Sequence, residues 1–129
     1  IIGGLCGTVL AHLMFEQTVW QTSAHMRSGM AQYGSEFVAT FGLLAVIFGG
    51  ICYRQTAVPW LVGLYITAAY WFTASTSFAN PAVTIARSFT DSFSGIFPGD
   101  MPFFIIAQTL AAAAASLVCG WLFADQSVK

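Results

Sequence analysis

The chain has 129 residues, of which 57% are hydrophobic and 7% are charged, and its formal net charge is −1. Soluble domains carry about 25% charged residues, so this composition indicates a membrane protein and offers nothing that would attract nucleic acid. Cys6, Cys52 and Cys119 lie far apart in apolar segments, which predicts packing roles. The sequence shows no metal-ligand spacing, and we expect no metal site.

Apolar segments and short polar connections alternate along the chain. Residues 1–15 are apolar but shorter than the roughly 20 residues that a spanning helix needs, and we expect them to be the end of a truncated span. After a polar connection, residues 34–53 predict one span and residues 58–76 predict the next. Residues 101–124 predict the last span. The whole of 1–129 is therefore expected to be a single truncated membrane unit.

Residues 80–92 form a different kind of segment, because about a dozen residues cannot cross a bilayer. Asn80 is a favoured N-cap and Pro81 a favoured first helical residue, so a helix is predicted to begin there. Its positive N-terminal end then lies at membrane depth. A short helix between two spans predicts a re-entrant half-helix that borders protein or a wet cavity. The alternative is an ordinary capped helix after a loop.

Two stretches, FANPAVTIAR at 78–87 and GSEFVAT at 34–40, resemble the aquaporin (major intrinsic protein) family. The resemblance covers nearly the whole chain. It implies an all-α integral membrane fold, an aquaporin-like right-handed helical bundle of two inverted repeats. Each repeat carries one re-entrant half-helix that begins with Asn-Pro-Ala. The chain resembles the C-terminal repeat, and the N-terminal repeat of the same protein is implied as its partner.

The resemblance also implies which residues border the pore. By position these are Ala68, Thr76, Ser77, Phe78, Asn80, Pro81, Ala82 and Val83. Most members carry Arg where this chain has Val83, and water-selective members carry His where it has Ala68. The implied constriction is wider and less polar than a strict water filter. It suits glycerol or neutral metalloid hydroxides, and an aquaporin subgroup linked to arsenic resistance has a similar Val.

Three polar side chains invite further hypotheses. The resemblance implies that Glu36 holds the loop before Asn80 by accepting backbone N–H groups, and the alternative is a carboxylate near the interface that water reaches. Arg87 could return a positive charge to the outer mouth of the pore; alternatively it pairs with Asp91 or extends to head groups. His12, on an apolar face, is expected to be packed and hydrogen-bonded.

The function that these features favour is a passive transmembrane channel for water and small uncharged solutes. The alternatives are another half-helix transporter, a membrane-embedded enzyme or a structural subunit. The sequence shows no catalytic pairing of carboxylates, His or Ser, so we expect neither an enzyme nor a cofactor. The expected partners are the lipid bilayer and, from the resemblance, three further copies in a homotetramer. The expected location is a bacterial plasma membrane.

Overall fold

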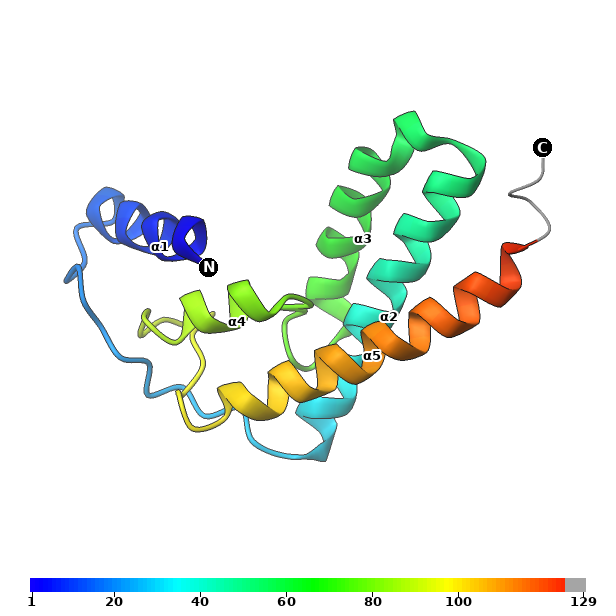
Figure 1. The fold of residues 1–129 in the computed structure, drawn as a ribbon. Coiled ribbons are helices and arrows are strands. Elements are labelled where there is room, and N and C mark those ends of the chain that lie inside the picture. The colour runs from blue at the N-terminus through cyan, green and yellow to red at the C-terminus, as the bar shows by residue number, and fades with distance from the viewer. Residues whose placement is uncertain (125–129) are drawn as a thin grey trace.

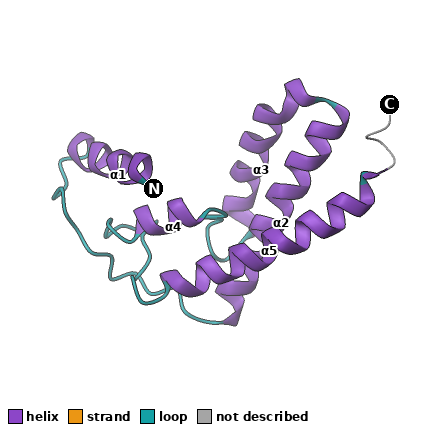
Figure 2. Cartoon of the chain, viewed as in Figure 1, coloured by secondary structure: helices purple, strands orange, loops and turns teal. Residues whose placement is uncertain are grey.

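The computed structural model describes residues 1–124, in which helices are joined by loops and no strand occurs (Figures 1 and 2). The elements in chain order are α1 (Ile2–Met14), α2 (Met30–Tyr53), the 3-10 helix η1 (Gln55–Ala57), α3 (Val58–Phe72), α4 (Pro81–Arg87) and α5 (Met101–Leu122). Residues 125–129, which were included in the predicted single unit, lie outside the described part.

Helix ends differ from the prediction where the chain enters and leaves α4. The span predicted to reach residue 76 ends at Phe72, because Thr73 turns to an extended conformation (φ −103°, ψ 137°). The half-helix predicted to reach residue 92 ends at Arg87 and has 7 residues. The Ser88 hydroxyl donates to the Ile85 carbonyl (2.7 Å), which closes the last turn of α4. Both predicted ends were therefore too late in the sequence.

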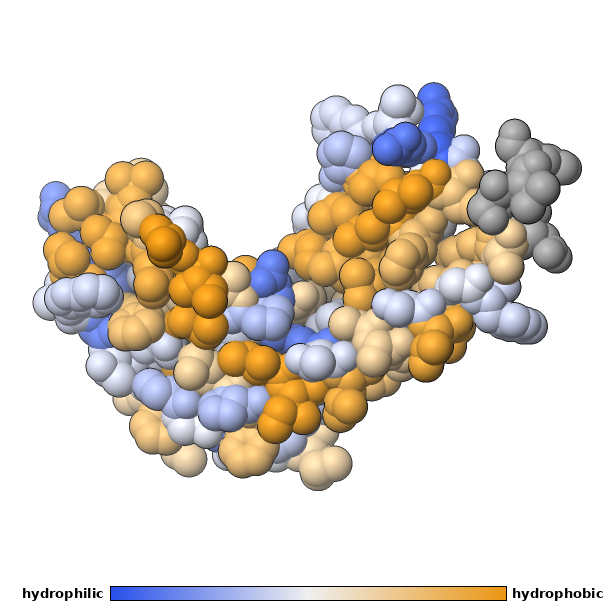
Figure 3. All heavy atoms as spheres, viewed as in Figure 1, coloured by the Kyte–Doolittle hydropathy of each residue, from blue (hydrophilic) through white to orange (hydrophobic). Residues whose placement is uncertain are grey.

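Two helices of the described part, α2 and α5, are long and apolar enough to cross a membrane. They pack against each other, and α2 also packs against α3, while α4 packs against α1 and α5. As a result α1 lies apart from the other long helices and reaches them through α4 (Figure 1). The visible face is hollowed between α1 and α3, and hydrophobic side chains cover both flanks (Figure 3).

Glycines allow the closest helix contacts. A Cβ added at Gly4 of α1 would lie 3.2 Å from the Ala86 Cβ and 3.4 Å from the Ala82 carbonyl oxygen of α4. On the other side of the fold, Gly42 of α2 faces the Tyr65 ring of α3. Small residues let helix backbones approach closely in lipid. The Gly4 contact lets α1 approach α4 closely, and the Gly42 contact does the same for α2 and α3.

Candidate functional site

The start of α4 is built by local chemistry. Asn80 is the N-cap, and its Oδ1 accepts a hydrogen bond from the Ala82 N–H (2.8 Å); Pro81 follows as the first helical residue. The Asn80 side chain is exposed, and within residues 1–124 its amide N–H groups have no hydrogen-bond partner. The side chain therefore caps the helix with its oxygen and keeps its amide donors available.

The loop from Thr73 to Ala79 has an unusual backbone. Thr76, Ser77 and Ala79 adopt left-handed conformations with φ of 61°, 51° and 49°. Non-glycine residues visit this region rarely, and a β-branched Thr does so at a steric cost. No described residue donates a hydrogen bond to the carbonyl oxygens of Thr76, Ser77 or Phe78. The turn thus leaves three acceptors free next to the start of α4.

Glu36 of α2 holds this loop in place through hydrogen bonds to its backbone. Its side chain is fully buried, and its carboxylate accepts hydrogen bonds from the backbone N–H groups of Phe78 (3.3 Å) and Ala79. Gln108 of α5 donates to Glu36 Oε1 (3.0 Å) and to Thr84 Oγ1 (2.8 Å). Buried polar groups need such partners. The network joins α2, α5, α4 and the loop, and Glu36 is buried within it, whereas the alternative required a carboxylate that water reaches.

The two positions where the constriction residues were expected lie in different surroundings. Val83 is half-buried and packs against a buried cluster of Phe78, Ile96 and Phe104. It also borders a cavity of about 760 Å³ between α1, α4 and the loop that follows α4. Ala68 is exposed on α3 and does not line that cavity. The described residues therefore do not bring these two positions into one cavity.

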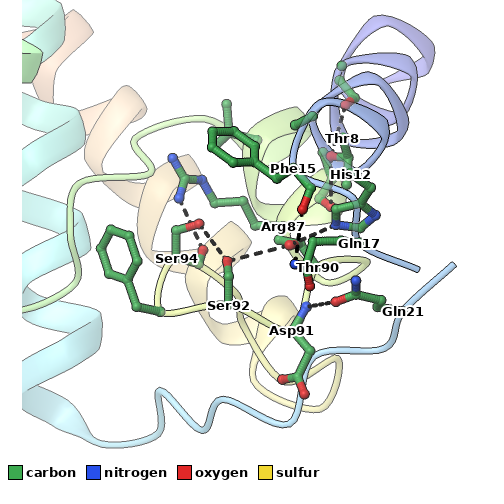
Figure 4. Close-up of a pocket in the computed structure, with 16 residues that line it drawn as sticks. Thr8, His12, Phe15, Gln17, Gln21, Arg87, Thr90, Asp91, Ser92 and Ser94 are labelled. Carbon is green, nitrogen blue, oxygen red and sulfur yellow. Dashed lines mark hydrogen bonds between the residues drawn. The ribbon is translucent and has the colours of Figure 1, made fainter. Parts of the chain in front are cut away.

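The cavity beside Val83 has a polar rim (Figure 4). His12 is buried there, with Nδ1 3.0 Å from the Val19 carbonyl oxygen and Nε2 2.9 Å from Thr90 Oγ1. Its predicted packed and hydrogen-bonded state is confirmed. Thr90 comes from the loop after α4, so the His12 bond ties α1 to that loop. Of the predicted pore residues, Val83 is the one that lines this cavity, together with Arg87.

Arg87 does not pair with Asp91, which was one of the two alternatives for its role. Its Nη1 donates to the Ser94 carbonyl (3.1 Å), and its Cζ lies 5.0 Å from the centroid of the Phe78 ring. The Asp91 carboxylate accepts instead from the Ala24 N–H (2.9 Å). Arg87 is half-buried and lines the cavity, so its charge lies beside the loop around Phe78.

Sequence reasoning missed two residues of this region. Gln108 is a polar side chain inside an apolar span, which is a usable signal for a buried hydrogen bond. Arg27 lies in the polar connection after α1, where an arginine is unremarkable, yet its side chain is 5% exposed. No feature of the sequence near Arg27 indicated this burial.

Comparisons with known proteins give a clear result. The chain is 60% identical over 122 residues to aquaglyceroporin AqpS of Rhizobium meliloti (strain 1021). The match covers 95% of this chain and 52% of that protein, so the chain spans about half the length of this relative. No protein-family model and no solved structure matches the chain. The match confirms the predicted resemblance to the aquaporin (major intrinsic protein) family and the all-α membrane fold: over nearly its whole length, this chain is similar to an aquaglyceroporin.

Proposed function

We propose that this chain forms part of the wall of a passive channel that conducts water and small uncharged solutes, glycerol among them. The relative at 60% identity is named an aquaglyceroporin, which supports this class of function and a location in a bacterial plasma membrane. The observation that carries the proposal is the polar start of α4. There the free amide of Asn80 lies next to three carbonyl oxygens that no described residue uses.

These groups suit a neutral solute that must give up water. The Asn80 amide donates and the carbonyls of Thr76, Ser77 and Phe78 accept, so a hydroxyl-bearing solute exchanges hydrogen bonds along the loop. The N-terminal end of α4 carries partial positive charge, which disfavours cations there. Val83 presents an apolar side chain beside this path, which favours glycerol or a neutral metalloid hydroxide over a narrow water-only filter. No step of this process changes a covalent bond, so the proposed protein is not an enzyme.

A complete path needs more wall than these helices supply. The hollowed face between α1 and α3 is left open by the described residues (Figure 3). We propose that an N-terminal repeat of the same protein covers this face and brings a second half-helix to Asn80. The bilayer surrounds the outer faces, and four such proteins assemble as a homotetramer. "Full-length protein" below means this chain together with that repeat.

The test is transport by the full-length protein in liposomes. Water, glycerol and arsenite fluxes are measured by stopped-flow light scattering, with empty liposomes as the baseline. We expect water and glycerol fluxes above the baseline, because the wall then contains both halves. The same full-length protein with Asn80→Ala should conduct less, since the amide donor is lost. Fluxes equal to those of empty liposomes for all three solutes would contradict the proposed channel.

A further inference from the structure

Arg27 joins three segments that are distant in the sequence. Its Nε donates to the Gly95 carbonyl (2.7 Å), its Nη2 to the Phe93 carbonyl (2.6 Å) and its Nη1 to the Ser75 carbonyl (3.3 Å). Its backbone N–H donates to Asp100 Oδ2 (2.7 Å). The side chain therefore connects the loop before α4 to the loop after it, from a position in the connection that precedes α2.

The charge of Arg27 is not neutralised by an ion pair. All three partners of its guanidinium are carbonyl oxygens, and within residues 1–124 no carboxylate forms an ion pair with it. Burial, and then the charge of Arg87, lower the pKa of the Arg27 guanidinium. The unperturbed pKa of an arginine is so far above neutral pH that the guanidinium nevertheless stays protonated. The side chain that carries this positive charge is 5% exposed, and it lies beside the loop before α4.

A second guanidinium lies at the same place. The Cζ of Arg27 is 5.2 Å from the centroid of the Phe78 ring, and the Cζ of Arg87 is 5.0 Å from the same centroid. Both distances are within the range of cation–π attraction, which is about 6 Å. Two like charges so close together repel each other. The Phe78 ring and four carbonyl oxygens hold them there. Three of these oxygens accept hydrogen bonds from Arg27, and the fourth, that of Ser94, accepts from Arg87.

We propose that Arg27 and Arg87, both on the Phe78 ring, form a fixed positive centre that excludes cations from the path along the loop before α4. The proposal rests on the proposed channel function. The Phe78 ring is part of that loop, and the Phe78 carbonyl is one of the free acceptors of the path. A cation approaching these acceptors meets two positive charges, whereas an uncharged solute does not. Arg27 is in addition a positioning residue, because it fixes the Ser75 carbonyl at the start of the same turn.

The test separates the charge of Arg27 from its hydrogen bonds. Full-length wild type, Arg27→Gln, Arg27→Lys and Arg87→Gln are reconstituted in liposomes, with Arg54→Gln as a control because Arg54 is an exposed arginine at the end of α2. Sodium and proton leak are recorded with entrapped dyes, and water and glycerol fluxes by light scattering. Thermal unfolding in detergent reports whether each variant is folded.

We expect Arg27→Gln and Arg87→Gln each to raise the ratio of cation leak to water flux by roughly fivefold or more, because each variant removes one of the two positive charges. Arg27→Lys should keep leak within about twofold of wild type, because it keeps the charge, but unfold at a lower temperature, because Lys cannot donate in the planar fork of Arg. Arg54→Gln should match wild type in every measurement.

Two results would overturn the proposal: a folded Arg27→Gln with wild-type leak, or an Arg27→Lys that leaks as much as Arg27→Gln. If Arg27→Gln does not fold, Arg87→Gln decides, and an unchanged leak in that variant overturns the shared positive centre. A wild type that passes neither water nor glycerol above empty liposomes is a different result. It would remove the proposed channel itself and, with it, this role of Arg27.

Discussion

Gln108 of α5 donates a hydrogen bond to the carboxylate of Glu36 of α2 across 3.0 Å, with both side chains buried. Glu36 in turn accepts from the N–H groups of Phe78 and Ala79. The two longest helices therefore meet at the level where the loop before α4 is held. Their packing and the shape of the loop depend on the same few polar atoms.

Replacing Glu36 should unfold the protein more readily. Glu36→Gln in the full-length protein swaps one acceptor oxygen for a donor, which leaves a backbone N–H of the loop unpaired. A buried group that loses its partner costs about 1–3 kcal/mol. We expect a lower midpoint of thermal unfolding in detergent for Glu36→Gln, and no change for Glu16→Gln, because Glu16 is exposed. Equal midpoints for the two variants would show that the carboxylate does not hold the loop.

Replacing Gln108 should have a smaller effect. Gln108→Leu removes the donors to Glu36 and Thr84, but it also removes an amide oxygen that is buried without a partner. Because one loss offsets the other, we expect the free energy of unfolding to fall by about 1 kcal/mol. The control is Thr109→Val, at an exposed site on the same helix. A Gln108→Leu variant as unstable as Glu36→Gln would mean that Gln108 does more than donate these bonds.

The contact between α1 and α4 can be tested with two neighbouring glycines. Gly4→Val places a side chain against Ala86 and the Ala82 carbonyl, whereas a Cβ at Gly3 meets no described atom within 4 Å. Overpacking costs about 1–3 kcal/mol, so Gly4→Val should lower the midpoint of thermal unfolding and reduce glycerol flux as α4 shifts. Gly3→Val should do neither. Similar losses in both variants would argue against the close approach of α1 to α4.

Position 83 should govern which neutral solutes pass. Val83→Arg adds a long, charged side chain beside the proposed path, so we expect the ratio of glycerol flux to water flux to fall in full-length liposomes. Val83→Leu adds bulk without charge and should lower the ratio less. Equal ratios in wild type and Val83→Arg would show that residue 83 does not border the path, and would favour reading this half-helix as that of a first repeat.

The sequence predicted best what depends on neighbouring residues. Asn80 and Pro81 located the start of α4 because capping is a local interaction, and the structure shows that cap. The end of α4 was predicted wrongly because backbone groups outside the helix bond to its last carbonyls. The Ser23 N–H donates to the Ser88 carbonyl, and the Ile96 N–H donates to the Arg87 carbonyl.

The roles of Arg27 were beyond reach for a related reason. Its guanidinium partners are backbone carbonyls 48 to 68 residues away in the sequence. Every residue has a carbonyl, so such partners leave no mark in the amino-acid pattern. Gln108 was a more accessible omission, since a polar side chain in an apolar span must find a partner. Its position four residues after Phe104, which is fully buried, indicates a face turned toward the interior.

The left-handed turn at Thr76, Ser77 and Ala79 has a consequence for regulation. This conformation is sparsely populated and persists only where surrounding structure imposes it. Here the Glu36 carboxylate accepts hydrogen bonds from Phe78 and Ala79, and Arg27 donates one to the Ser75 carbonyl. A segment held from two directions cannot widen or narrow without releasing one of them. In the proposed channel we therefore expect this loop to act as a rigid gauge of solute size, and we expect any opening or closing to involve other parts of the protein.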